Sequence, residues 1–295
     1  MDMTIEPGTY VVAVSGGVDS MALLDMMRQR PDLRLVVAHL DHGIRADSAE
    51  DRRLVQAYAA EHGLPFVYHA LELGERASEA AARAARYEFL HKVREATGAR
   101  AVVTAHHQDD VLETAVHNIF RGTGRKGLSS LGAGEYLIRP LLHASKADLK
   151  KYALANGLKW REDSTNTNLA YKRNYIRHKV LPRLSKSQRQ ELHGYIKKTR
   201  QLNYEIDSLL EEYLRRQPAA DRLDRKWFIG LPHGMAREML AAWLRANGVG
   251  KFDRKLLERL VTAAKTLRVG KFMSLDSRHS LSITANELAL VSRDR

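Results

Sequence analysis

The sequence contains no cysteine among its 295 residues. That absence excludes disulfides, thiolate catalysis, cysteine-based zinc sites and cysteine-held iron–sulfur clusters. No uninterrupted apolar run approaches the roughly 20 residues that a membrane-spanning helix requires. The first residues, Met1 to Thr4, also lack the basic and apolar blocks of a secretory signal. We therefore expect a soluble protein of the cytoplasm that acts without a membrane.

Acidic residues are scarce in the second half of the chain. Residues 1–144 hold 16 Lys and Arg against 19 Asp and Glu, whereas residues 145–295 hold 32 against 16. Such segregated positive charge favours a polyanionic partner, and nucleic acid is the first candidate. An anionic membrane surface would attract the same charge, but no amphipathic helix with an aromatic-rich apolar face is evident. A chain of this length is expected to form two domains.

Short β-branched segments alternate with helical patterns in the first half. Strands are expected at 11–14, 33–39, 65–70 and 101–105. The helices that follow them are expected around Met21, Leu24 and Met27, and at about 48–62, 78–97 and 109–120. Successive strand–helix units predict an α/β fold with a parallel sheet and helices on both faces. Ligands bind beyond the carboxyl ends of such strands, so the segments after Val14, Ala38 and Thr104 should share one crevice.

The pattern changes after residue 144 to long, charged helical stretches. Helices are expected at 145–156, 187–216, 233–247 and 253–265, with a linker at 218–220 and strands at 270–275, 280–284 and 287–291. This pattern predicts a smaller, mainly helical α+β domain that ends in a β meander. We expect a catalytic domain at 1–185 and a basic, substrate-binding domain at 186–295.

A candidate phosphate-binding loop follows the first expected strand. It comprises Ser15, Gly16, Gly17, Val18, Asp19 and Ser20. Backbone N–H groups at the start of the next helix suit an anion, paired glycines permit close approach, and Asp19 can reach a magnesium ion. Neither the Gly-Lys-Ser/Thr of a P-loop nor the third glycine of a dinucleotide fingerprint is present. A tight structural turn is the alternative.

This loop resembles the pyrophosphate-binding loop of the N-type ATP pyrophosphatases. The resemblance implies ATP as a substrate, cleavage between its α- and β-phosphates, and activation of a carbonyl oxygen as an adenylate. GMP synthetase, NAD synthetase, tRNA thiolases and lysidine synthases belong to that group. It also implies an adenine nucleotide alpha hydrolase-like fold, with His39 and Asp41 after the second strand near the adenosine.

Polar residues gather where the strand at 101–105 turns into a helix. We expect His106, Asp110 and Glu113 to project to one side. Such residues could hold magnesium, take up a proton from an attacking amine, or bind the ammonium group of a substrate. Asp109 reads equally well as a helix cap.

Seven motifs in order resemble the lysidine synthases. They are the phosphate loop, His39–Arg45, Arg86 in its alanine-rich helix, the His106–Thr114 segment, Arg121–Gly124 followed by Arg139–Leu141, Arg161–Asn166 and Lys172–Arg177. The resemblance covers about residues 9–185, and longer family members carry a further C-terminal domain. We therefore expect a compact form without that domain.

The resemblance implies ligation of L-lysine to C2 of the wobble cytidine of a tRNA(Ile) with a CAU anticodon. Asp19 would bind Mg²⁺, Arg86 would steady the adenylate, and His106, Asp110 and Glu113 would position lysine. A surface salt bridge is the alternative for Arg86. The expected tRNA contacts are Arg121, Arg173, Asn174 and Arg177. A homodimer is left open.

Three other readings compete with this one. A tRNA thiolase shares the loop, but such enzymes commonly need cysteine. A non-enzymatic RNA-binding module explains the basic half but not the grouped carboxylates. A synthetase of the GMP or NAD type, acting on a small molecule, is the stronger rival, and the basic half counts against it.

Overall fold

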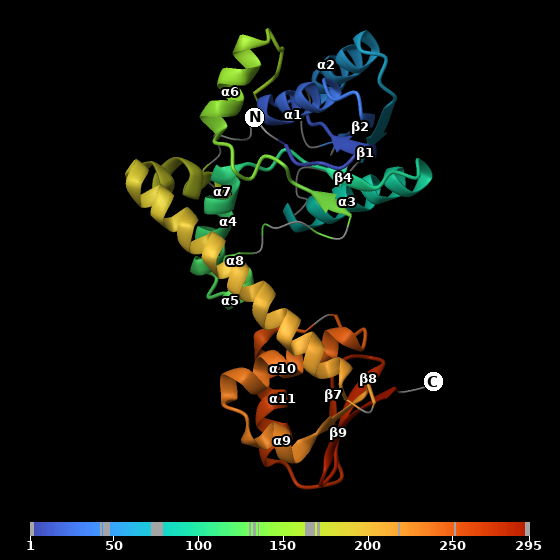
Figure 1. Cartoon of the computed structure of the whole chain (residues 1–295), viewed down its shortest axis with the longest axis vertical. Helices are drawn as coiled ribbons and strands as arrows, with labels where there is room; N and C mark the ends of the chain where they lie inside the picture. Colours follow the sequence, from blue (N-terminus) through green and yellow to red (C-terminus); the bar gives the residue numbers. More distant parts are fainter. Residues whose placement is uncertain are drawn as a thin grey trace. The chain divides into compact units, whose positions relative to one another are not determined.

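The computed structural model describes residues 3–41, 43, 48–71, 79–129, 131, 134, 136–162, 169, 172–217, 219–250 and 252–292. The chain forms two compact units, Met1–Arg200 and Gln201–Arg295. Each has a sheet of its own (Figure 1). Among the described residues, no helix combines the length and apolar character needed to cross a bilayer.

The first unit is built on a parallel sheet. Its strands are β1 (Gly8–Ala13), β2 (Leu33–Asp41), β3 (Phe66–Ala70), β4 (Ala101–Val103) and β5 (Leu137–Ile138), in the order β3-β2-β1-β4-β5. In register, Val12 of β1 lies between Val37 of β2 and Val103 of β4. The order reverses at β1, so the loop that follows β1 opens at the switch point where α/β sheets bind ligands.

Helices cover both faces of this sheet, as Figure 1 shows for α1 and α3. Alternation along the strands sends Val12 and Val37 to one face and Val11 and Val36 to the other. The first face packs against α1 (Val18–Arg28), α2 (Ser48–Glu61) and α6 (Lys146–Ala155), and the second against α3 (Glu79–Ala96). The predicted α/β fold is thereby confirmed.

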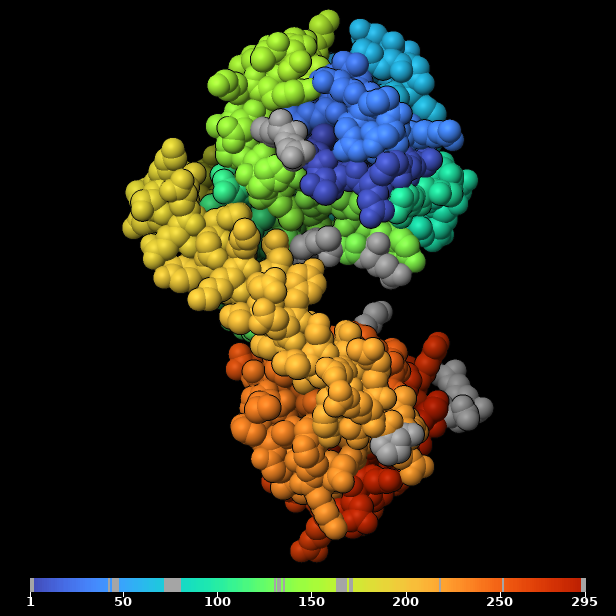
Figure 2. Space-filling view, in the orientation of Figure 1, coloured from blue at the N-terminus to red at the C-terminus, as the bar shows by residue number. Residues whose placement is uncertain are grey.

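Helix α6 comes from far along the chain but packs against α1. In the space-filling view the blue surface of residues near the N-terminus adjoins the yellow-green surface of α6 (Figure 2). Ser145 caps α6 by accepting a hydrogen bond from the Asp148 backbone N–H at 3.2 Å, while Asp148 accepts from the Ser145 N–H at 3.1 Å. This cap fixes where the helix starts, and therefore where Lys146 lies.

The remaining helices of the first unit pack around α4 (Gln108–Phe120), and all but the short helix at Lys172–Tyr175 contribute to a separate apolar cluster with it. They are α5 (Arg125–Leu128), α7 (Lys172–Tyr175), a π-helix η2 (Ile176–Val180), a 3₁₀ turn η3 (Leu181–Arg183) and α8 (Lys186–Arg215), which continues into the second unit. Buried Val111, Ala115, Ile176 and Ile196 belong to this cluster. It fixes α4 against the segment that carries Arg177.

The second unit combines helices with an antiparallel sheet of order β6-β9-β8-β7. Its elements are β6 (Arg222–Asp224), α9 (Arg225–Gly230), α10 (His233–Ala246), α11 (Arg254–Thr266), β7 (Lys271–Ser274), β8 (His279–Ile283) and β9 (Glu287–Ser292). Trp243, Phe228 and Leu260 lie at the centre of its core. The predicted α+β character and terminal meander are confirmed, whereas β5, β6 and α9 had no counterpart in the sequence prediction.

Candidate active site

The phosphate loop lies between the end of β1 and the start of α1. Gly16 has a φ of +89°, a conformation that glycine adopts without strain, and a Cβ there would approach Asp51 at 3.4 Å. Ser20 Oγ donates to the Gly17 carbonyl oxygen at 2.9 Å and accepts from the Ser15 N–H at 3.2 Å. Gly17 is the N-cap of α1 and provides no side-chain cap. The first N–H groups of α1 are thus directed to a space that suits an anion.

Val18 and Asp19 form the first turn of α1 with different environments. Val18 is buried, so its side chain serves the core and only its backbone can serve a ligand. Asp19 Oδ2 lies 3.5 Å from His107 Nε2 and 3.7 Å from Lys146 Nζ. Burial alone would raise the pKa of Asp19, but His107, Lys146 and Arg177 together lower it. Asp19 is therefore held as a carboxylate.

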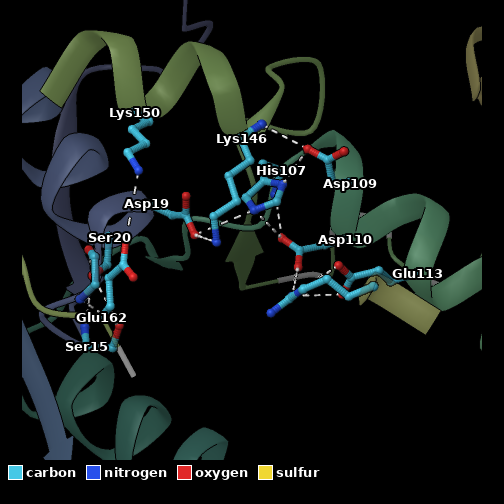
Figure 3. A network of polar contacts seen from close by, with 12 residues as sticks. Ser15, Asp19, Ser20, His107, Asp109, Asp110, Glu113, Lys146, Lys150 and Glu162 are labelled. Atoms are coloured by element: carbon cyan, nitrogen blue, oxygen red, sulfur yellow. Dashed lines mark hydrogen bonds and ion pairs between the residues drawn. The ribbon is translucent and has the colours of Figure 1, made fainter. Parts of the chain in front are cut away.

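His107, and not the predicted His106, joins the phosphate loop to α4 (Figure 3). Its Nε2 lies 3.5 Å from Asp110 Oδ2, and its Nδ1 lies 3.6 Å from Asp109 Oδ2. Burial opposes protonation, yet the hydrogen bond to Asp19 and the nearby carboxylates raise the pKa of His107 overall. The Asp110 carboxylate also accepts the His107 backbone N–H at 2.9 Å and so caps α4.

His106 faces a different environment, so the predicted grouping of His106 with Asp110 and Glu113 is corrected. His107 is extended, and adjacent side chains of extended backbone point to opposite sides. His106 Nδ1 lies 2.8 Å from Thr104 Oγ1. Burial, reinforced by the positive charges of Arg139, Arg86, Arg83 and Arg173, lowers the pKa of His106 to about 3. It is a neutral histidine beside four arginines.

Three of the arginines near His106 share Tyr87 as a neighbour. Arg83 Nη2 and Arg139 Nη2 each lie 3.4 Å from the Tyr87 hydroxyl, and the guanidinium of Arg86 lies 5.7 Å from the ring centroid. The buried Arg139 Nε has no hydrogen-bond partner within the described part of the chain. Arg86 thus lies within a cationic group that suits a phosphate, and its contact with the adenylate stays a prediction.

Glu113 is buried in α4 and is paired with Arg177. Arg177 Nε and Nη2 donate to the two carboxylate oxygens of Glu113 at 2.6 and 2.8 Å. Burial raises the pKa of Glu113, and the Arg177 charge offsets this only partly. The sequence placed Glu113 with lysine and Arg177 with tRNA, whereas the structure pairs the two residues with each other.

His39 and Asp41 hold the loops around the phosphate site. His39 Nδ1 donates to the Val14 carbonyl oxygen at 2.8 Å, and burial lowers the pKa of His39, so the ring is neutral. Only 3% of His39 is exposed, which leaves little surface for the nucleotide contact that was predicted. Asp41 accepts from the Gly43 N–H at 2.9 Å and from the Ser48 hydroxyl at 2.6 Å, at the entry to α2. Both residues support the shape of the site.

The predicted tRNA contacts are divided between surface and interior. Arg121 is exposed after α4, and Arg173 is half-buried near His106. Asn174 is only 9% exposed, so the structure does not place it on the surface as a phosphate contact would require. Parts of the predicted motifs and linker lie outside the described residues, namely residues 42, 44–45, 163–166 and 218.

Two residues to which the sequence assigned no role, Lys146 and Arg161, complete the site. Lys146 reaches Asp19 through its side chain and Asp109 through its backbone N–H, at 2.9 Å. Arg161 donates its backbone N–H to the Gly16 carbonyl oxygen at 3.0 Å and its Nε to Asp51 at 2.8 Å. The Gly16 loop is thereby tied to α2. A signal for Lys146 existed, since it opens the helix after a fifth strand, but that strand is only two residues long.

The donor set fits a magnesium ion that is held mainly by its substrate. Asp19 Oδ1 is buried without a hydrogen-bond partner in the described structure. The described residues contain no group of three or more His, Asp or Glu that could hold a metal. Mg²⁺ typically binds one or two carboxylates together with substrate phosphates and water. Asp19 could therefore hold a magnesium ion brought by a nucleotide.

Comparison with known proteins agrees with this geometry. A family model described as the PP-loop domain matches residues 4–184. The chain belongs to the PP-loop family. The PP-loop domain uses ATP, which accords with a loop of this shape at the start of α1. The matched range includes Ser15–Ser20, which we call the PP-loop.

Curated relatives of this PP-loop protein are tRNA(Ile)-lysidine synthases. The one from Geobacter sulfurreducens is 46% identical over 188 residues, which are 60% of this chain and 40% of that protein. The one from Thermotoga maritima is 38% identical over 189 residues, 60% of this chain and 46% of that protein. The one from Thermus thermophilus is 37% identical over 260 residues, 85% of this chain and 48% of that protein. The predicted resemblance is confirmed, and the chain spans about half the length of these relatives.

Proposed function

We propose that this protein ligates L-lysine to C2 of the wobble cytidine of tRNA(Ile) with a CAU anticodon, using ATP. The observation that carries the proposal is that a group of cations and a group of carboxylates both lie at the carboxyl ends of the parallel strands. The N–H groups of the PP-loop, Lys146 and the arginines near His106 suit phosphates, with Asp19 beside Lys146 for a magnesium ion. Asp110 and Glu113 of α4 suit an amine. An enzyme that adenylates a base and then aminates it needs both.

In the first half-reaction the C2 oxygen of cytidine attacks the α-phosphorus of ATP, and pyrophosphate leaves. The N–H groups at the start of α1 bind the departing pyrophosphate, and a magnesium ion at Asp19 would neutralise charge on the phosphates. Lys146 adds a cation beside Asp19. Arg86 lies in the group that would steady the α-phosphate of the adenylate.

In the second half-reaction the ε-amine of lysine attacks C2, and AMP leaves with the former C2 oxygen. The amine must first lose a proton, and a carboxylate of α4 can hold the ammonium form and accept that proton. Asp110 and Glu113 are the candidates. We assign tRNA binding to the basic second half of the chain, residues 145–295, together with the exposed Arg121.

Mass spectrometry of nucleosides tests this proposal. Unmodified tRNA(Ile) is incubated with enzyme, Mg²⁺, ATP and lysine, and then digested. We expect a cytidine that is heavier by one lysine less one water, absent when ATP or lysine is omitted and absent with Asp19→Asn. AMP release that needs no tRNA would instead indicate a small-molecule synthetase and would overturn the proposal.

A further inference from the structure

Glu113 and Arg177 form a closed pair in the middle of the candidate active site. Both carboxylate oxygens of Glu113 accept hydrogen bonds from the guanidinium, and only 4% of the Glu113 side chain is exposed. A fork of this kind neutralises the carboxylate and uses one lone pair of each oxygen. An ammonium ion would therefore find little net negative charge at Glu113 while Arg177 stays in place.

Arg177 lies on a backbone segment of unusual geometry. It is the second residue of the π-helix Ile176–Val180, which follows the α-helical Lys172–Tyr175 and precedes the 3₁₀ turn Leu181–Arg183. Three hydrogen-bond patterns thus succeed one another within 12 residues. π-helical turns are rare and often occur at functional sites. The segment that carries Arg177 is therefore a candidate functional element.

A chain of alternating charges connects this pair to the PP-loop (Figure 3). Arg177 Nη2 lies 3.6 Å from Asp110 Oδ1, and Asp110 Oδ2 lies 3.5 Å from His107 Nε2. His107 in turn contacts Asp19 at 3.5 Å. An anion that enters beside Asp19 therefore alters the balance of charge around Arg177.

A buried carboxylate cannot be left without a cation at low cost, because removing one partner of a buried pair typically costs about 3–5 kcal/mol. Arg177 can leave Glu113 only if another cation replaces it and another anion receives the guanidinium. A substrate pair consisting of an anionic phosphoryl group and a cationic amine meets both conditions at once.

We propose that Arg177 is a positioning residue that keeps Glu113 closed to the amine substrate until an anionic adenylate forms, when Arg177 turns to the phosphoryl group and Glu113 receives the ammonium. This inference rests on the proposed function. It adds to the order of the half-reactions that the amine site opens only after the adenylyl group has been transferred to the base.

Equilibrium dialysis of radiolabelled lysine at pH 8, without ATP or tRNA, tests the order. We expect the wild-type protein to bind lysine at least about tenfold more weakly than Arg177→Met, in which the competing charge is gone. Arg177→Lys keeps the charge but loses the fork and should lie between the two. Arg189→Met is the matched control, since Arg189 Nη2 donates to the Leu181 carbonyl oxygen at 2.8 Å and no ion pair joins it to Glu113 within the described residues.

A purely structural role for Arg177 would weaken lysine binding on substitution, so tighter binding is the distinguishing readout. The inference is overturned if Arg177→Met binds lysine no more tightly than the wild-type protein does. If Arg177→Met does not fold, the lysine affinity of Arg177→Lys is compared with that of the wild type instead. If the wild-type protein makes lysidine but these variants bind lysine no more tightly than it does, the closed pair is refuted and the proposed function stands. Wild-type protein that makes no lysidine refutes the proposed function.

Discussion

His106 and His107 are neighbours in the chain with opposite electrostatic environments. His107 lies among three carboxylates, which raise its pKa despite burial. His106 lies among arginines, and its pKa falls to about 3. One extended step of backbone separates a site for cations from a site for anions. Chemistry that handles a phosphate and an amine needs such a division.

The pKa of His106 predicts how stability changes with acidity. Because the folded-state pKa of about 3 lies below the unfolded value of 6.5, the unfolded chain takes up a proton first as pH falls. Stability should therefore decline below about pH 6.5, by up to about 1.4 kcal/mol per pH unit from this group. We expect His106→Asn to show a shallower decline between pH 6.5 and 4 in urea unfolding. The exposed His69→Asn should follow the wild type, and parallel curves for His106→Asn would contradict the assignment.

Glu113→Gln should separate the two half-reactions. The variant keeps the shape of the side chain and removes its charge, so label from α-labelled ATP should be retained on tRNA while lysidine formation falls at least about tenfold at ordinary lysine concentrations. High lysine should restore part of the rate. Glu95→Gln, a surface carboxylate of α3, is the control. Failure to adenylate at all would place Glu113 in the nucleotide site instead.

Part of the site follows from the sequence. Asp19 and Asp110 were expected at strand ends that parallel topology brings together, and the structure joins them through His107. Whether His106 or His107 faces Asp110 depends on how side chains alternate in the extended segment after β4. The end of β4 was predicted two residues too late. The Glu113–Arg177 pair joins residues 64 apart in the chain, and no periodicity predicts such a contact.

Helix α1 is held to two other helices by one buried carboxylate. Asp25, only 1% exposed, accepts hydrogen bonds from Tyr58 of α2 at 2.5 Å and from Tyr152 of α6 at 2.6 Å. Burial raises the pKa of Asp25, but these hydroxyls and Arg28 lower it overall. Because α1 carries Asp19 and α6 carries Lys146, this arrangement also fixes their separation.

Tyr152→Phe should therefore lower both the free energy of unfolding and the affinity for ATP. Loss of a hydrogen bond to a buried carboxylate should lower the free energy of unfolding by about 1.5–3 kcal/mol, measured by urea denaturation. We also expect a higher KM for ATP in pyrophosphate exchange, because α6 loses a contact to α1. Tyr204→Phe, 58% exposed on α8, should stay within about 0.5 kcal/mol of the wild type. A stable Tyr152→Phe protein would show that the hydrogen bond is dispensable.

Long, strongly patterned elements were predicted well. Helix α8 was expected at 187–216 and is found at Lys186–Arg215, and β9 was expected at 287–291 and is found at Glu287–Ser292. The misses are short. Strand β5 has two residues and α7 has four, so neither is long enough to show a period. Such elements form because tertiary neighbours provide their hydrogen bonds.

At the scale of the whole molecule, the two halves of the chain differ in charge. The excess of Lys and Arg lies after residue 144, whereas the PP-loop lies near the N-terminus. Asp19→Asn should therefore abolish adenylation, yet change the affinity for tRNA(Ile) less than about threefold in filter binding at 100 mM salt. Asp32→Asn on the surface is the control. A comparable loss of tRNA binding in Asp19→Asn would show that the nucleotide site and the tRNA surface are not independent.

Helix α8 belongs to both units, because its 30 residues run uninterrupted past the boundary at Arg200. Ile196 lies in the apolar cluster of the first unit, and Leu214 packs in that of the second. Cutting the chain between Arg200 and Gln201 would leave up to four backbone carbonyl groups and four N–H groups of a helix interior without partners. Expression of the PP-loop unit alone should therefore extend to Gln217, where α8 has ended. The helix then stays intact, although its last turns have no second unit to pack against.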